Sequence, residues 1–88
     1  MPEQDSQLTS RIKEILVERL FLDVEPASVG TEQSLTEGYG VDSVRLFDMV
    51  VGLEEDFSIS FEDEELTIEN FDTVAAIAAR VREKLDAP

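Results

Sequence analysis

The sequence contains neither cysteine nor histidine among its 88 residues. Without cysteine there can be no disulfide, no thiolate zinc site and no cysteine nucleophile. Without histidine the chain lacks the commonest general base and the commonest metal ligand. The residues that most often carry catalysis are missing, so an enzyme is the least favoured interpretation.

Positive charge is also scarce, because 7 Lys and Arg residues face 21 Asp and Glu residues and leave a net charge of −14. Nucleic acids and anionic membranes present phosphate groups that call for Lys and Arg, so neither is expected as a partner. A chain this acidic should instead attract basic protein surfaces and steer them toward itself.

Targeting segments and long apolar runs are absent too. The start, MPEQDSQLTS, lacks the basic and apolar regions of a signal peptide, and no apolar run approaches membrane-spanning length. We therefore expect a soluble, cytoplasmic protein with no membrane insertion. The length predicts one domain over residues 1–88, with disorder confined to the first and last few residues, and the hydrophobic fraction of 42% argues against disorder elsewhere.

Helical periodicity dominates the apolar pattern. A first helix is predicted from about Ser6, as its N-cap, to Phe21, on a stripe of Leu8, Ile12, Ile15, Leu16 and Leu20. A long connection over residues 23–42 follows, with room for a short helical turn whose position the pattern does not fix.

A second helix is predicted over about 43–56, with Gly52 tolerated inside it at a cost of about 1 kcal/mol. The alternating stretch FSIS has no partner strand, so it predicts a loop that leads into a helical turn near 63–66. A last helix should span about 72–85, capped by Asn70 or Asp72. The fold class is therefore all-α, a small bundle of three main helices plus one short helix, with a long loop between the first and second helices.

Two motif candidates fail on inspection. The acidic stretch DFSISFEDEEL has Phe61 at the sixth position, where a calcium loop of the EF-hand type needs glycine, so no specific metal site is predicted. The tripeptide Gly38-Tyr39-Gly40 lacks the third glycine of a dinucleotide fingerprint, and it predicts a turn.

Ser43 stands where the long loop becomes a helix. A serine at that place is far more often a helix cap than a nucleophile. Nothing adjacent in the sequence could activate it, and no histidine exists anywhere in the chain. If Ser43 reacts, another protein must activate it.

The residues between Arg45 and Arg80 carry acidic charges and no basic ones. A surface charged with a single sign over this length favours docking of basic partners.

The stretch GYGVDSVRLFDMVVGLEEDFSISFEDEEL, residues 38–66, resembles the acyl carrier protein family. Gly40-Val41-Asp42-Ser43-Val44 matches the family's motif, Glu54-Glu55-Asp56-Phe57 matches the close of the helix that follows, and residues 64–74 resemble the tail of the pattern. The resemblance implies a non-catalytic carrier. It implies that a phosphopantetheinyl transferase moves 4′-phosphopantetheine from coenzyme A onto Ser43, next to Asp42, and that the arm's thiol then carries acyl groups as thioesters.

The resemblance also implies the partners of the carrier, which would be acyl-loading, condensing and modifying enzymes with basic docking surfaces. The carrier itself is expected to be a monomer. The implied docking residues lie on the second helix and are Val44, Arg45, Asp48, Val51, Glu54 and Glu55. A possible acyl cavity between the second and last helices would be lined by Leu46, Phe47, Val50, Val74, Ile77 and Ala78.

Departures from the commonest family choices, at Val44, Arg45, Phe47 and Glu62, suggest a specialised, stand-alone carrier in fatty-acid, lipid or polyketide-type biosynthesis. Two alternatives stay open. A peptidyl, aryl or D-alanyl carrier would use the same fold and arm with different cargo. A protein of another class, an unmodified acidic helical protein that inhibits or binds a basic partner, would need no arm.

The charge imbalance predicts that salt stabilises the fold. Raising NaCl from about 0.01 to 1 M shortens the Debye length from about 30 to 3 Å and screens the repulsion among the carboxylates. We expect the thermal midpoint, followed by circular dichroism, to rise over this range. A midpoint that does not change with ionic strength would contradict self-repulsion as a major cost.

Overall fold

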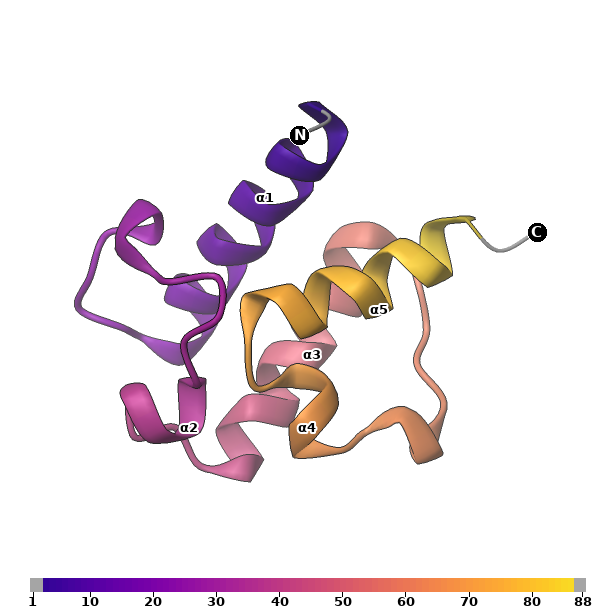
Figure 1. The fold of residues 1–88 in the computed structure, drawn as a ribbon. Coiled ribbons are helices and arrows are strands. Elements are labelled where there is room, and N and C mark those ends of the chain that lie inside the picture. The colour runs from indigo at the N-terminus through magenta and orange to yellow at the C-terminus, as the bar shows by residue number, and fades with distance from the viewer. Residues whose placement is uncertain (1–2, 87–88) are drawn as a thin grey trace.

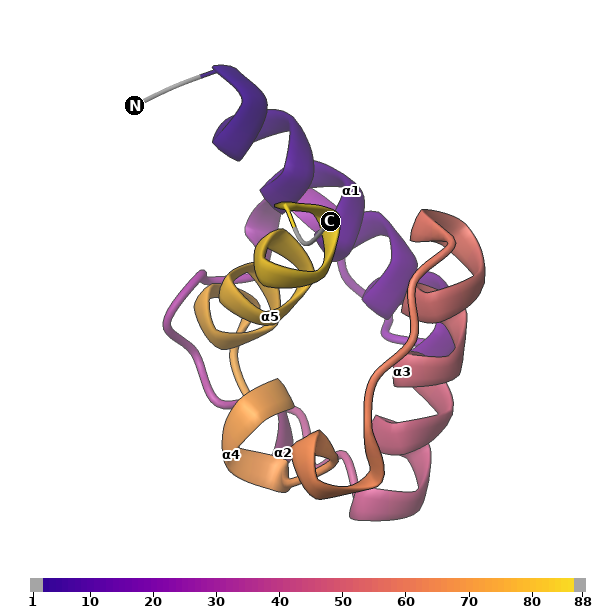
Figure 2. The same cartoon turned by 90° about the vertical axis from the view of Figure 1, so that its right-hand side faces the viewer.

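The computed structural model describes residues 3–86, so the disorder predicted for the chain ends falls partly on residues 1–2 and 87–88, outside the described part. Its main helices are α1 (Glu3–Leu20), α3 (Ser43–Phe57) and α5 (Val74–Asp86). Shorter elements join them: α2 (Leu35–Gly38), α4 (Ile68–Phe71) and the 3-10 turns η1 (Pro26–Ser28) and η2 (Asp63–Glu65). Within residues 3–86 every regular element is helical, which confirms the all-α class (Figures 1 and 2).

The periodic stripes located the three main helices, and the turn predicted near residues 63–66 is present as η2. The first helix extends further than predicted, because α1 already includes Ser6, which is therefore not its N-cap. The unplaced turn in the long connection resolves into two elements, η1 and α2.

The predicted start of the last helix is wrong. The chain first forms the single turn of α4, capped by the side chain of Thr67, and then bends before α5 begins at Val74. Neither Asn70 nor Asp72 caps α5. The hydroxyl of Thr73 accepts the Ala76 amide at 3.1 Å instead, which is the bond of an N-cap.

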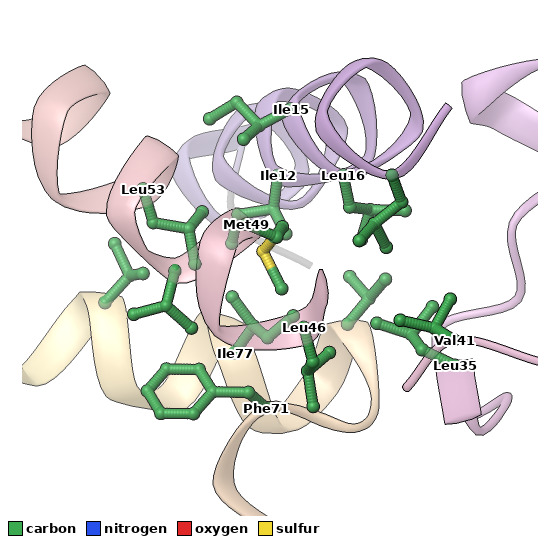
Figure 3. Close-up of a cluster of buried hydrophobic side chains, with 14 of the residues drawn as sticks. Ile12, Ile15, Leu16, Leu35, Val41, Leu46, Met49, Leu53, Phe71 and Ile77 are labelled. Carbon is green, nitrogen blue, oxygen red and sulfur yellow. The ribbon is translucent and has the colours of Figure 1, made fainter. Parts of the chain in front are cut away.

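A single apolar core joins α1, α3, α4 and α5 with the loop before α3. Figure 3 shows Ile12 of α1, Met49 and Leu46 of α3 and Ile77 of α5 meeting at its centre. Phe71 closes one side, and its ring packs edge-on against Phe61 with 5.1 Å between ring centroids. Among the described side chains, no polar or charged residue is buried, so the core depends on apolar contacts alone.

A row of arginine contacts holds α1 against α3. The Arg11 guanidinium pairs with both carboxylate oxygens of Asp56, with Nε 3.0 Å from Oδ2, and this contact holds the pKa of Asp56 below its usual range. Arg19 reaches Glu55 at 2.8 Å. Arg45 donates to the backbone carbonyl of Leu20, the last residue of α1. The cation at position 45 thus satisfies a free carbonyl at a helix C-terminus.

Gly52 has a packing reason that the sequence pattern did not reveal. It is buried in α3, and a Cβ at this position would lie 2.6 Å from Nε and 3.1 Å from Cγ of Arg19. The arginine therefore crosses α3 over a residue with no side chain, and this crossing lets it reach Glu55.

In the residues described here, no helix has both the length and the apolar character needed to cross a bilayer.

The Arg19 crossing predicts a sign reversal for one substitution. Gly52→Ala, which stabilises an ordinary helix by about 1 kcal/mol, should lower the free energy of unfolding here by about 1 kcal/mol, because the new methyl group displaces Arg19. In an Arg19→Ala background the same change should stabilise the protein. Urea unfolding of the four proteins in this double-mutant cycle measures the coupling. Stabilisation by Gly52→Ala in both backgrounds would contradict the packing explanation.

Candidate functional site

The candidate site is the junction where the long loop enters α3, and Asp42 forms the cap there. Its backbone is extended, with φ −84° and ψ 170°, and its Oδ1 accepts the Arg45 amide at 2.8 Å. Ser43 is therefore the first residue of the helix and not its cap. The interpretation of Ser43 as a simple N-cap is wrong, because the preceding aspartate already does this.

The Ser43 side chain is half-buried, and its hydroxyl forms no hydrogen bond with any other group in residues 3–86. Gly40, three residues before Ser43, has φ +65°, and an added Cβ there would meet no heavy atom within 4 Å, so the space beside Gly40 is open. The helix that starts here is 15 residues long, so its unpaired N–H groups and its dipole favour a negative group at this end.

The loop before Ser43 is held firmly from the core side. Val41 and Leu35 are both buried, and the Val41 amide donates to the Leu35 carbonyl at 3.4 Å. Tyr39 packs against the core, and its hydroxyl donates to the side-chain oxygen of Gln33 at 3.1 Å. Gly40, with its left-handed backbone, thus joins two anchored residues, and Ser43 has a defined position.

A second set of bonds ties this loop to the bend between α4 and α5. The Asp72 carboxylate accepts the Ser34 hydroxyl at 2.7 Å and the Thr36 amide at 2.9 Å, while its backbone carbonyl accepts the Leu35 amide at 2.7 Å. Partial burial opposes ionisation of Asp72, but these hydrogen bonds outweigh it and hold the pKa of the carboxyl below its usual value. The sequence pattern predicted Asp72 at a helix start, and it did not reveal this role.

The six predicted docking residues separate into two groups. Val44 and Val51, exposed by 76% and 46%, face outward on α3 together with the exposed side chain of Asp48. Glu55 is exposed too, but it lies on the flank that meets α1 and pairs with Arg19. Arg45 is instead bound to the Leu20 carbonyl. Glu54 is half-buried, and its Oε2 accepts the Phe61 amide at 2.9 Å. Three of the six therefore have side-chain bonds within the fold, namely Arg45, Glu54 and Glu55, and the other three, Val44, Asp48 and Val51, form the outward face of α3.

The six predicted acyl-cavity residues belong to the core or pack against it. Leu46, Val50, Val74 and Ile77 are buried, and Phe47 and Ala78 are half-buried against them. An apolar groove of about 370 Å³ does include Ala78, but it lies between α1 and α5, where Leu8 and Ala75 also line it. A slot between α3 and α5 would therefore need these packed side chains to move apart.

Together these features define a class of protein. It is a helical bundle that presents an unengaged serine hydroxyl at the start of an acidic helix. No group of the described chain is bonded to that hydroxyl as a base, so another protein would have to activate the serine.

Comparison with known proteins agrees with this class. Residues 10–81 match the family described as "Phosphopantetheine attachment site". The chain is similar to the acyl carrier protein of Petrotoga mobilis, with 32% identity over 91% of this chain and 89% of that one. It is also similar to the acyl carrier protein of an Exiguobacterium species, with 33% identity over 90% of this chain and 95% of that one. The structure resembles the crystal structure of the Thermotoga maritima acyl carrier protein, with a TM-score of 0.74 and 30% identity over 93% and 91% of the two chains.

The chain belongs to the phosphopantetheine-bearing acyl carrier protein family. It is accordingly a non-catalytic carrier, its prosthetic group is 4′-phosphopantetheine, and it interacts with a phosphopantetheinyl transferase and with biosynthetic enzymes.

The Asp72 bonds predict an acid-sensitive stability. Asp72→Asn should lower the free energy of unfolding at pH 7 by about 1–2 kcal/mol, because a neutral amide accepts the Ser34 and Thr36 hydrogens less strongly. The folded-state pKa is depressed, so this contribution is present above the usual carboxyl pKa near 3.9 and is lost as pH falls below it. Urea midpoints measured from pH 7 down to 3 should show the difference between the two proteins shrinking.

Asp48→Asn, at an exposed position of α3, is the matched control and should leave the urea midpoint at pH 7 nearly unchanged. Equal stability of wild type and Asp72→Asn at pH 7 would show that the hydrogen bonds to the Asp72 carboxylate contribute nothing to the free energy of unfolding.

Proposed function

We propose that Ser43 is the attachment point of 4′-phosphopantetheine and that the chain shuttles acyl groups, as thioesters on this arm, between enzymes of fatty-acid, lipid or polyketide-type biosynthesis. One observation carries the proposal. Asp42 caps α3, so the Ser43 hydroxyl is unengaged within the described chain at a helix N-terminus that favours an anion.

The residues present fit this group. The arm, when bound, supplies the thiol that a chain without cysteine lacks. Asp42 fixes the start of α3 and hence the direction of the Ser43 side chain. The first N–H groups of α3 stabilise the negative charge of a phosphodiester on the serine oxygen. No base is bonded to the Ser43 hydroxyl within the described residues, so the transferase must accept the proton of the hydroxyl.

Partner enzymes are proposed to dock on the outward face of α3. Asp48 there would attract basic side chains, and Val44 and Val51 would supply apolar contact beside it. Glu55, at the edge of this face, would add negative charge only where a basic partner competes with Arg19. The Arg45 guanidinium keeps its charge, but it is directed toward the end of α1 by its bond to the Leu20 carbonyl. We propose that the carrier acts as a monomer, since a net charge of −14 opposes self-association.

The cargo is proposed to be an acyl group. The relatives are named acyl carrier proteins, which favours acyl cargo over peptidyl, aryl or D-alanyl cargo. An acyl chain entering between α3 and α5 would have to part Leu46, Val50 and Ile77, which are fully packed. We therefore propose that any sequestration of the chain is coupled to a local opening of the core.

Loading of Ser43 gives the decisive experiment. Incubation with coenzyme A and a broad-specificity phosphopantetheinyl transferase should add the mass of one phosphopantetheine to the intact protein. Ser43→Ala should gain no mass, while Ser60→Ala, which removes a hydroxyl from an exposed loop position, should be loaded like wild type. A folded wild-type chain that stays unmodified, or a Ser43→Ala variant that gains the arm, would overturn the proposal.

A further inference from the structure

Phe21 occupies a backbone conformation that does not suit it. It follows the last residue of α1 with φ 55°, in the left-handed region, and the Leu22 amide donates back to the Val17 carbonyl at 3.1 Å. This is the hydrogen bond of a Schellman ending, in which the residue at Phe21 is usually glycine because a Cβ is strained there. A phenylalanine at this position makes the helix ending less favourable than glycine would.

The Phe21 ring is not buried in the fold, so burial of apolar surface does not offset this strain. Phe21 is 85% exposed, more than any other large apolar residue described, whereas Leu20 before it is buried and Leu22 after it packs against the core. A lone exposed apolar residue is common on protein surfaces. An exposed aromatic ring on a strained backbone is less so, and strain of this kind often accompanies function.

Phe21 lies beside the candidate site. The carbonyl of Leu20, the residue before it, receives the guanidinium of Arg45, which stands two residues after Ser43. Figure 2 shows the end of α1 lying alongside α3. On α3, Arg45 and Gly52 form the flank that faces α1, and the outward residues Val44 and Asp48 adjoin that flank at helical spacing. Phe21 therefore follows directly on a residue that is bound to α3 two positions after Ser43.

The loop residues that follow Phe21 are mostly apolar or acidic. Val24 is 38% exposed, and Asp23 and Glu25 are exposed carboxylates. The Arg45 guanidinium is the nearby cation, and it is bound to the Leu20 carbonyl. An aromatic anchor with an acidic border complements an apolar pocket edged by Lys and Arg.

We propose that Phe21 is a docking anchor for the phosphopantetheinyl transferase, its ring entering an apolar pocket with a basic edge on that enzyme. The proposal rests on the proposed function of Ser43. The transferase is favoured over later partners because it acts on the serine hydroxyl itself and must cover the surface around it. Enzymes that act on the end of the arm can bind further away. Binding energy at such an interface concentrates in a few aromatic and arginine anchors.

The test is the kinetics of loading, with coenzyme A saturating and the full chain as the varied substrate. Phe21→Gly should raise the KM of the transferase for the carrier about tenfold, as loss of an interface anchor does, while kcat stays unchanged because Ser43 and the α3 cap are intact. The thermal midpoint of the variant should equal or exceed that of wild type, since glycine relieves the backbone strain.

Three further variants separate the ring from other effects. Phe21→Asn tolerates the left-handed backbone but lacks the ring, so it should match Phe21→Gly, whereas Phe21→Tyr should keep the wild-type KM. Leu85→Ala removes another exposed apolar side chain, 49% exposed near the end of α5, and should not change KM.

A wild-type chain that is loaded with the same KM as Phe21→Gly would overturn this inference and leave the proposed function standing. So would a Phe21→Gly variant with a lower thermal midpoint and unchanged KM, which would assign the ring to folding. A folded wild-type chain that is not loaded at all would overturn the proposed function and this inference with it.

Discussion

The hydrogen bond from the Arg45 amide to the Asp42 carboxylate sets the arrangement of the whole site. This hydrogen bond caps α3, so the helix begins at Ser43. The Ser43 hydroxyl is then not needed as a cap, and it forms no hydrogen bond in the described chain. The apolar stripe of α3, which packs into the core, then sets the rotation of the helix and decides which of its faces are outward. Val44 and Asp48 then face away from the core, while Leu46 and Met49 enter it.

The distribution of charge follows from the same rotation. The flank of α3 that meets α1 places Asp56 and Glu55 within reach of Arg11 and Arg19, and it directs Arg45 to the end of α1. The scarce arginines of this half of the chain are therefore used to hold two helices together. These contacts are largely exposed, so each contributes modestly to stability, yet together they draw three guanidinium groups toward the contact between α1 and α3.

Much of this fold could be predicted from spacing alone, because the stripes of α1, α3 and α5 are local patterns. The family resemblance located Ser43 as the candidate attachment residue. Features made by residues distant in sequence could not be predicted. Asp72 looked like a cap for the last helix, but its carboxylate is bound to Ser34, and Thr73 caps α5 instead. Gly52 looked like a tolerated defect, and only the crossing of Arg19 explains it. The strained conformation of Phe21 leaves no periodic signal, although an aromatic residue directly after an amphipathic stripe is a position to inspect for a helix ending.

The bonds between the long loop and the α4–α5 bend have a consequence for motion. The amides of Leu35 and Thr36 are bound to Asp72, and the amide of Ala75 donates to the Thr31 carbonyl at 3.0 Å. Bonds in both directions between the two segments make them one cooperative unit of local opening, so their amide hydrogens should exchange together and more slowly than those of an untethered surface loop. The loop that leads to Ser43 can then change shape only when the C-terminal part of the chain moves with it, which links events at the serine to the packing of α5.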